Sequence, residues 1–297
     1  MTRFQALLFL SFVGVLASSG CATAPLDVRV PRDARVVELL GDYTTIGRSP
    51  RNRYAVLIRG QEFRADPDRP FRISTNEDVK REGHPVPDPY IAGDQDQLTR
   101  LLASKGYDVY RADMGELDAK DVRRLLEKIA ILSDGDTQVF VSYSGEGDAK
   151  GLRTRTLEIG PGRHLVAPNA TLAPDELVGL CSSVRGSTAV LLNACESGVF
   201  AEAARKNPDF RGVLIAACGV GFATTPHEPA GTSAIVASFL DLYRDDPGKV
   251  TNLSSVRLER AGGRFTNIAH HWSDFWGGAG LPISYLPVVY ASADFLL

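Results

Sequence analysis

Aliphatic runs and amphipathic segments alternate along this chain from about residue 53 onward. Each aliphatic run is short and has turn-forming residues beside it, which is typical of a strand buried on both faces of a parallel sheet. Five runs are predicted as strands on this basis: Tyr54–Ile58, Tyr107–Ala112, Val139–Tyr143, Ala189–Leu192 and Gly212–Ala217.

The segments between these strands carry apolar residues at helical spacing. The clearest one begins at Asp118, a predicted N-cap, and places Val122, Leu125 and Ile129 on one face. Further helices are predicted at about residues 94–105, 173–181, 199–206 and 232–243. Strands that alternate with helices predict an α/β fold, with a mostly parallel central sheet covered by helices on both faces.

The remaining segments show weaker patterns. Residues 61–93 are polar, rich in proline and without a period, so we predict a long loop near the carboxyl edge of the sheet. Residues 152–167 predict a hairpin around Gly160-Pro161-Gly162. Past residue 243 the pattern predicts only a short helix near residues 254–260 and a strand near residues 285–290.

Composition excludes several classes of function. The chain has 297 residues, of which 44% are hydrophobic and 23% charged, as in an ordinary globular protein. Its net charge of -3 gives no basis for binding nucleic acid or an anionic membrane. No Walker-type, G-x-S-x-G or complete dinucleotide-binding motif is present, so no cofactor is predicted. Without an internal repeat or boundary, residues 53–297 are predicted to form one domain.

The first residues have the plan of a bacterial export signal. Arg3 precedes an apolar run, Phe4–Ala17, which is shorter than the roughly 20 residues of a membrane span. Small residues then lead to Cys21, and this order resembles a lipoprotein signal. The resemblance is imperfect, because Ser18 stands where such signals usually have leucine.

Two maturation routes fit this segment. In the favoured route, residues 1–21 contain the signal peptide and Cys21 becomes the lipidated first residue of the mature chain. The alternative is ordinary cleavage after Ala24. Residues 22–52, with three prolines, are predicted as a tether to the domain. We therefore expect an exported protein that is held at the bacterial cell envelope by a lipid anchor.

Three cysteines follow Cys21 in the sequence. Because Cys181, Cys195 and Cys218 are odd in number, at least one thiol is free or paired outside the chain. Cys181 and Cys218 can be drawn as a bridge, but small buried core residues are the favoured interpretation.

Two of the predicted strands end in polar motifs. The third strand leads into Ser144-Gly145-Glu146-Gly147, and the fourth leads into Asn193-Ala194-Cys195-Glu196-Ser197-Gly198. The carboxyl ends of parallel strands are where open α/β sheets place ligands and reactive groups. In order and spacing the two motifs resemble the catalytic segments of the caspase-like cysteine peptidases, which include caspases, metacaspases and legumains.

This resemblance covers roughly residues 53–243. In the family, an S-G-H-G motif supplies the histidine and an A-C-x-S-G type motif supplies the nucleophile. The resemblance therefore implies a three-layer caspase-like sandwich and peptide-bond hydrolysis with Cys195 as the nucleophile. It also implies that the backbone N–H groups of Gly147 and Cys195 form an oxyanion hole, which stabilises the charge that develops in the transition state.

The sequence departs from the family at the histidine position, which is occupied by Glu146. A thiol with a pKa of about 8.5 needs a base or a cation beside it to supply thiolate at neutral pH. An ionised carboxylate instead disfavours the thiolate and holds no proton for the leaving amine. Glu146 could serve as a general acid only if burial kept it protonated. Asn193, at a substrate-contacting position of the family, replaces a frequent carboxylate, so no preference for a basic or other side chain is predicted.

The chain has five histidines that could replace the missing base: His84, His164, His227, His270 and His271. Of these, His164 lies near the end of the predicted hairpin and His227 follows the fifth strand. Both can approach the carboxyl edge of the sheet, His227 more readily, but an ordinary surface or loop histidine is the favoured interpretation of each. His270 and His271 precede Asp274 in a segment without regular spacing, and no metal site is predicted there.

Three functional interpretations follow from these motifs. The chain is an active cysteine endopeptidase with an altered base, a pseudopeptidase that binds a peptide or partner at the bacterial envelope, or a competent peptidase inactivated by a natural or engineered substitution at Glu146. In each of them the partner is a peptide or protein, and nucleic acid has no role. We expect hydrolysis by this chain to be weak or absent.

Overall fold

The computed structural model describes most of the chain after residue 25. The described residues are 26, 28–39, 46–65, 83–85, 89–160, 163–166, 170–222, 231–256 and 287–297. The predicted signal peptide at residues 1–21 and its Cys21 lie outside these ranges. None of the helices within them is both long enough and apolar enough to cross a membrane.

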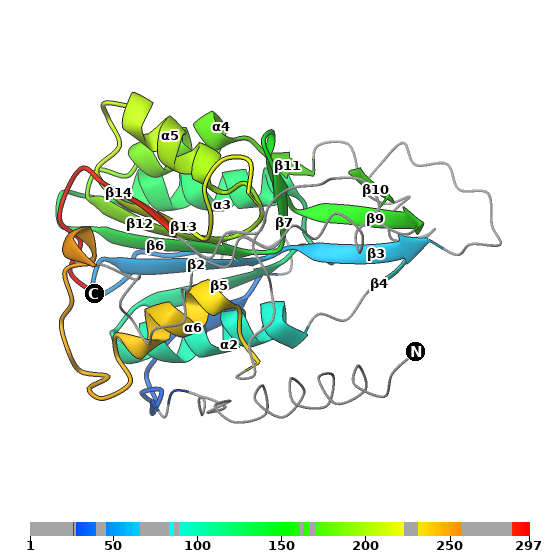
Figure 1. Ribbon diagram of the computed structural model, residues 1–297. Helices are drawn as coiled ribbons and strands as arrows, with labels where there is room; N and C mark the ends of the chain where they lie inside the picture. The colour runs from blue at the N-terminus through cyan, green and yellow to red at the C-terminus, as the bar shows by residue number, and fades with distance from the viewer. Residues whose placement is uncertain are drawn as a thin grey trace, which may run out of the picture.

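A seven-stranded sheet forms the centre of the described structure (Figure 1). Neighbouring strands are parallel, except that the last strand pairs antiparallel with the one before it. In spatial order the strands are β1 (Val36–Glu38), β5 (Asp108–Asp113), β2 (Arg53–Arg59), β6 (Gln138–Ser144), β12 (Ser187–Asn193), β13 (Gly212–Ala216) and β14 (Val288–Ala291).

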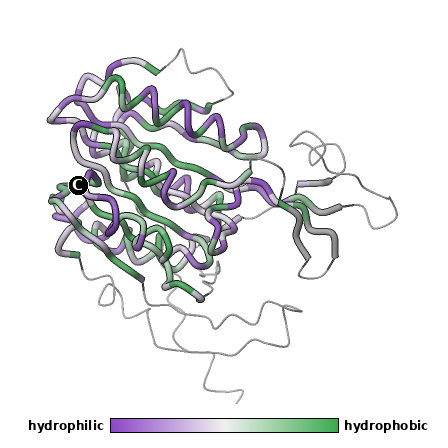
Figure 2. The backbone as a smooth tube through the Cα atoms, turned by 90° about the horizontal axis from the view of Figure 1, so that it is seen from above, coloured by the Kyte–Doolittle hydropathy of each residue, from purple (hydrophilic) through white to green (hydrophobic). Residues whose placement is uncertain are grey.

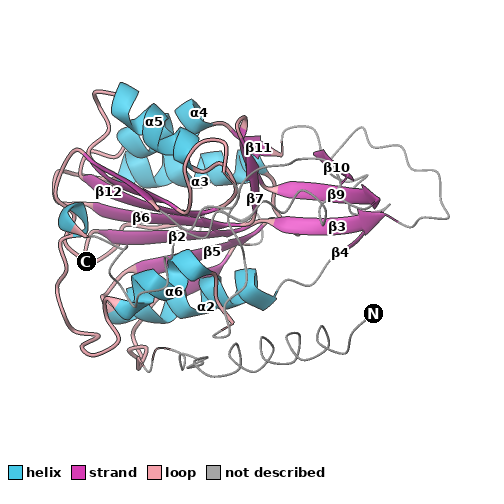
Figure 3. Ribbon diagram, in the orientation of Figure 1, coloured by secondary structure: helices cyan, strands magenta, loops and turns pink. Residues whose placement is uncertain are grey.

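Helices cover both faces of this sheet (Figure 3). One face carries α2 (Pro89–Ser104) and α6 (Ala234–Asp241). The opposite face carries α3 (Ala119–Leu132), α4 (Pro174–Ser182) and α5 (Gly198–Lys206). The predicted α/β fold, with a mostly parallel sheet between two helical layers, is confirmed as a three-layer sandwich.

The aliphatic runs of the sequence correspond to strands that are covered on both sides. In β2, β6 and β12, five or six consecutive residues are buried. Their side chains alternate between two cores, so that Val141 packs on the α3 side while Phe140 packs on the α6 side. There the ring of Phe140 lies 5.7 Å from that of Phe239, centroid to centroid. Both cores need an apolar residue, which removes the alternation seen in half-exposed strands.

Helix α3 begins where the sequence predicted. The carboxylate of Asp118 accepts hydrogen bonds from the backbone N–H groups of Lys120 and Asp121, at 3.0 and 3.2 Å. The Asp121 side chain in turn accepts the backbone N–H of Asp118 at 2.8 Å. This reciprocal capping box satisfies N–H groups that the first helical turn leaves without partners.

A second sheet projects from the sandwich as an arm (Figure 2). Its strands, in spatial order, are β10 (Arg163–Val166), β9 (Arg155–Gly160), β3 (Gln61–Ala65) and β4 (Gly83–Pro85). The antiparallel pairing of β9 with β10 confirms the predicted hairpin. The prediction of a structureless loop over residues 61–93 is wrong, because β3 and β4 lie within it and α2 begins at Pro89. The main partner of β3 is β9, a distant segment whose pairing leaves no periodic signal in either sequence.

The predicted tether over residues 22–52 is also wrong in part. Within it, β1 pairs with β5 as the edge strand of the central sheet. Leu39 and Ile46 join the core on the α3 side, each 2% exposed. The domain therefore begins well before residue 53. A strand of three residues is too short for its pattern to be recognised.

The chain after α6 forms a smaller share of the fold. A single turn of 3-10 helix, η2 (Leu253–Ser255), stands where a helix over residues 254–260 was predicted, and residues 257–260 lie outside the described part. The late strand predicted near residues 285–290 corresponds to β14, which begins at Val288. Its antiparallel pairing with β13 completes that edge of the sheet.

Candidate functional site

The two predicted motifs leave the central sheet side by side. In the parallel pairing of β6 with β12, Ser144 lies opposite Asn193, so both strands end at the same level. The backbone N–H of Gly145 donates to the carbonyl oxygen of Asn193 at 3.0 Å. A Cβ atom added to Gly147 would lie 2.8 Å from the Cys195 carbonyl oxygen, too close for any side chain. The Gly147 position of one motif therefore touches the Cys195 position of the other.

The connections of the sheet place this contact in a favourable location for a ligand. Strand β2 leads to α2 on one face, whereas its neighbour β6 leads to α4 on the other. Where neighbouring strands diverge in this way, their carboxyl ends border a crevice in which open α/β sheets bind ligands. Gly60 follows β2 at this point, and its N–H donates to the carbonyl oxygen of Ser144 at 2.9 Å.

A buried tyrosine holds the backbone of the first motif. The hydroxyl of Tyr143 lies 2.8 Å from the carbonyl oxygen of Glu146 and 2.8 Å from that of Arg153, and it donates to them. Burial raises the pKa of Tyr143 well above its usual range; the charge of Glu146 acts in the same direction, and the guanidinium of Arg153 opposes it. A Cβ atom on Gly60 or Gly145 would lie 2.6 Å from this hydroxyl. Glycine is therefore required at both places for the tyrosine to reach its acceptors.

The second motif turns sharply after Cys195, whose side chain is half-buried. Glu196 has a φ of 52°, in the left-handed region that non-glycine residues rarely occupy. Its backbone N–H donates to the carbonyl oxygen of Phe222 at 2.8 Å, which fixes the turn against the loop after β13. Helix α5 then begins at Gly198, where a Cβ atom would lie 2.8 Å from the backbone nitrogen of Val220.

The other two cysteines of the described domain are buried, free thiols. Burial raises the pKa of Cys181 to about 12. Burial also raises the pKa of Cys218, whose sulfur lies 3.2 Å from the Phe222 carbonyl oxygen and 3.5 Å from that of Ala194. They do not form a bridge, and their role as core residues is confirmed. Cys195 is the most exposed of the three thiols.

Glu146 stands in a small three-stranded sheet beside the site. The strands are β7 (Glu146–Asp148), β8 (Gly151–Arg153) and β11 (Thr171–Leu172). In the antiparallel pairing of β7 with β8, Glu146 lies opposite Arg153, whose guanidinium also forms an ion pair with Asp148 at 2.5 Å. The Glu146 side chain is exposed, so it lacks the burial that a general acid would need.

Asn193 is oriented toward the interior of the domain. It is 4% exposed, and its amide nitrogen donates to the carboxylate of Asp94 at 3.1 Å. The predicted contact between Asn193 and a substrate stays a prediction. The amide nitrogen of Asn193 already donates to Asp94.

Asp94 was not identified from the sequence as a functional residue. It lies on α2, is 1% exposed and also accepts hydrogen bonds from the Ser144 hydroxyl and the Ser233 backbone N–H, at 2.8 and 2.7 Å. Burial raises the pKa of Asp94 to about 7. A signal was present in the sequence, because Asp94 is in helical register with Leu98 and Leu101, on the face that enters the core.

The histidines considered as replacement bases fall outside what the structure describes. The backbones of His84 and His164 are in β4 and β10 of the arm, but their imidazoles are not among the described side chains. His227, His270 and His271 lie outside the described ranges altogether. Within those ranges, no group of three or more His, Cys, Asp or Glu side chains is arranged to hold a metal ion.

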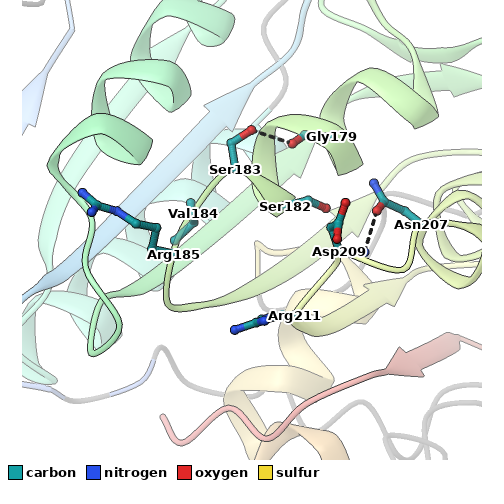
Figure 4. Close-up of a pocket in the computed structure, with 8 residues that line it drawn as sticks. All are labelled: Gly179, Ser182, Ser183, Val184, Arg185, Asn207, Asp209 and Arg211. Carbon is teal, nitrogen blue, oxygen red and sulfur yellow. Dashed lines mark hydrogen bonds between the residues drawn. The ribbon is translucent and has the colours of Figure 1, made fainter.

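A pocket of about 480 Å³ lies away from this site (Figure 4). It is bordered by the segments that lead into the amino-terminal ends of β12 and β13, including Arg185 and Arg211. Cys195 and Gly147 lie at the carboxyl edge of the sheet and are not among its lining residues. We therefore do not assign this pocket to the candidate site.

The contact between the motifs yields a prediction about Gly147. Replacing Gly147 by alanine should lower the free energy of unfolding by about 1–3 kcal/mol, because the methyl group would overlap the Cys195 carbonyl oxygen and the Ala194 side chain. Urea denaturation measures the change. Gly179→Ala is the matched control, because a Cβ atom at that position of α4 would have nothing within 4 Å. This variant should raise the free energy of unfolding by about 0.5–1 kcal/mol, since alanine favours a helix more than glycine does. Equal behaviour of the two variants would show that Gly147 is not tightly packed.

Comparison with known proteins identifies no family. No protein family matches the sequence, and no curated protein matches it. Among solved structures, the chain is similar to protein GSU0716 from Geobacter sulfurreducens, with 15% identity, a TM-score of 0.47 and coverage of 81% of this chain and 93% of that one. It is also similar to Raptor from Chaetomium thermophilum, with 14% identity, a TM-score of 0.32 and coverage of 68% of this chain and 17% of that one. Similarities of this size carry no functional argument.

Proposed function

We propose that this chain has a caspase-like cysteine peptidase site, which binds a peptide segment at Cys195 and hydrolyses peptide bonds weakly or not at all. The observation that supports it most directly is the contact between Gly147 and the Cys195 backbone. It joins the residue that carries the thiol to the residue whose N–H group is expected to stabilise an oxyanion. The two motifs, which are distant in the sequence, thereby meet at one place.

The expected oxyanion hole depends on backbone alone. The N–H groups of Gly147 and Cys195 require no particular side chain, and the Tyr143 hydroxyl holds the adjacent carbonyl of Glu146. Donors that are already oriented before reaction can stabilise developing charge at little reorganisation cost. A site of this kind can bind a peptide carbonyl and support attack by a thiolate, even when the thiolate forms slowly.

The weak step is proton transfer. Glu146 occupies the position of the histidine, and its exposed carboxylate can neither stabilise the Cys195 thiolate nor return a proton to the leaving amine. The absence of a base at position 146 favours a second candidate function, in which the site binds a peptide or protein partner without any covalent step. With the predicted lipid anchor at Cys21, such a pseudopeptidase would act at the bacterial envelope.

A peptide vinyl sulfone library tests the proposal. We expect Cys195 to be alkylated slowly at pH 7 and faster at pH 9, because the thiolate is the reactive form. Hydrolysis of fluorogenic peptides should equal that of Cys195→Ser. Labelling should vanish in Cys195→Ser and persist in Cys218→Ser, which removes a buried thiol beside the same loop.

Each other outcome selects a different function. Rapid peptide hydrolysis that Cys195→Ser abolishes would show an active peptidase whose base is supplied by another group, and would overturn the proposal. No labelling of Cys195 even at pH 9, together with saturable peptide binding, would support the non-covalent function. Neither labelling nor binding would reject both.

A further inference from the structure

Asp94 connects three parts of the site, although the proposed chemistry does not use it. One carboxylate oxygen accepts the hydroxyl of Ser144 at the end of β6 and the amide of Asn193 at the end of β12. The other oxygen accepts the backbone N–H of Ser233, the N-cap of α6. Two of these partners, Ser144 and Asn193, lie close in sequence to Gly147 and Cys195 respectively. A single buried side chain therefore bridges both motif strands and the start of a helix.

Within the described residues, no cation neutralises this carboxyl group. Among the described residues, no Lys or Arg nitrogen forms an ion pair with Asp94, and β6 and β12 contain no charged residue. The arginines of the nearby strands pair elsewhere: Arg59 of β2 with Asp113, and Arg111 of β5 with Glu38 and Asp96. The main influences on the pKa of Asp94 are burial and its hydrogen bonds from Ser233, Ser144 and Asn193, with no charged group among them. Burying a carboxyl without a countercharge is costly, so this residue is unlike an ordinary core contact.

The backbone around Asp94 is closely packed as well. A Cβ atom on the preceding Gly93 would lie 1.7 Å from the carbonyl oxygen of Gly231, which comes two residues before Ser233. Only glycine therefore lets α2 approach the segment that leads into α6. The close approach of the two backbones is what brings the Ser233 N–H within reach of the carboxylate.

We propose that Asp94 is a positioning residue, which holds the strand ends of Gly147 and Cys195 in register with each other and with the start of α6. It touches no reacting atom and acts through Ser144, Asn193 and Ser233. This inference rests on the proposed function in one respect: the strand ends that Asp94 holds are those that form the proposed peptide site. If it is correct, opening at any one of the three anchored segments should be coupled to opening at the other two.

Protonation of Asp94 provides a readout of this coupling. Burial raises the pKa of Asp94 from 3.8 to about 7, and the hydrogen bonds from Ser233, Ser144 and Asn193 oppose that change. In an opened state the carboxyl is hydrated and its pKa returns toward 3.8. The closed state then binds the extra proton between these values. Opening therefore becomes easier as the pH rises from about 4 to about 7, and it levels off at higher pH.

Hydrogen–deuterium exchange of the full chain measures this opening. Exchange at pH 5, 6, 7 and 8, corrected for the intrinsic pH dependence of amide exchange, gives an opening constant for residues 144–147, 193–198 and 232–237. We expect all three constants to rise together, by about tenfold or more between pH 5 and pH 8. In Asp94→Asn, which cannot ionise, the rise should be lost in all three segments.

Two further variants keep the test decisive. Asp96→Asn removes an exposed carboxylate two residues away on α2, paired with Arg111, and should keep the wild-type response. Ser144→Ala removes a hydrogen bond that favours the ionised form of Asp94, so the midpoint of the response should move to higher pH. The proposal is wrong if the response persists in Asp94→Asn, if its midpoint does not move in Ser144→Ala, or if the three segments open independently.

The exchange experiment and the probe experiment can fail separately. Failure of Cys195 labelling and of peptide binding would reject the proposed function while leaving the coupled opening measurable. Conversely, normal labelling without coupled, Asp94-dependent opening would reject the positioning role alone.

Discussion

Replacing Glu146 by histidine is expected to increase peptide hydrolysis by about a hundredfold or more, since a positioned general acid and base contributes about 10²–10⁴ to the rate. The exposed position leaves room for an imidazole. The Tyr143 hydroxyl, bonded to the backbone carbonyl of residue 146, should keep that residue in place because no side-chain atom is involved. The imidazole would take the proton of Cys195 and return one to the leaving amine. The measurement is kcat/KM for a fluorogenic peptide mixture between pH 5 and pH 9.

Two controls separate this effect from the removal of a negative charge. Glu146→Gln removes the charge without adding a base, so it should gain much less than Glu146→His. Adding Cys195→Ser to Glu146→His should abolish the gain. The rate of Glu146→His should fall on the acidic side near the ordinary histidine pKa of about 6.5. If Cys195 is labelled by the probe but Glu146→His gains nothing, the cleft no longer orients a peptide for attack.

Replacing Arg155 by methionine should lower the free energy of unfolding by about 3–5 kcal/mol, because each of three carbonyl groups loses a donor and a buried polar group left without its partner costs about 1–3 kcal/mol. Arg155 is 2% exposed and donates to the carbonyl oxygens of Met114, Gly115 and Leu117, with shortest distances of 2.7, 3.2 and 2.6 Å. Its guanidinium also lies 6.0 Å from the centre of the Phe63 ring. Methionine fills a similar volume but leaves those carbonyl groups without a donor.

The Arg155 prediction is checked by urea denaturation. Arg205→Met is the control, because Arg205 is exposed on α5 and lies 5.7 Å from the centre of the Tyr290 ring. Arg205→Met should lower the free energy of unfolding by no more than about 1 kcal/mol. A loss below about 1 kcal/mol in Arg155→Met would mean that water or a rearranged loop satisfies the carbonyl groups. Because Arg155 ties the first residue of the arm's β9 to the loop between β5 and α3, the arm is expected to loosen first.

The layered core could be predicted because its signals are local. A strand such as β12 is a continuous aliphatic run, and α3 combines an amphipathic period with the Asp118 cap; both properties are contained within a few neighbouring residues. The arm could not be predicted in the same way. Strand β3 is polar and depends on backbone hydrogen bonds to β9, whose position relative to β3 is set only when the intervening sheet has formed.

The candidate site, like the fold, was predictable only where its signals are local in the sequence. The sequence determined which residues follow β6 and β12, and therefore that Glu146 and Cys195 would stand at one edge of a parallel sheet, because the carboxyl ends of parallel strands share an edge. Tertiary structure decided that Gly147 touches the Cys195 backbone, that Glu146 is exposed and that Asn193 binds Asp94. These contacts join segments far apart in the chain, and the packing of α2 and α6 onto the sheet determines their distances and burial.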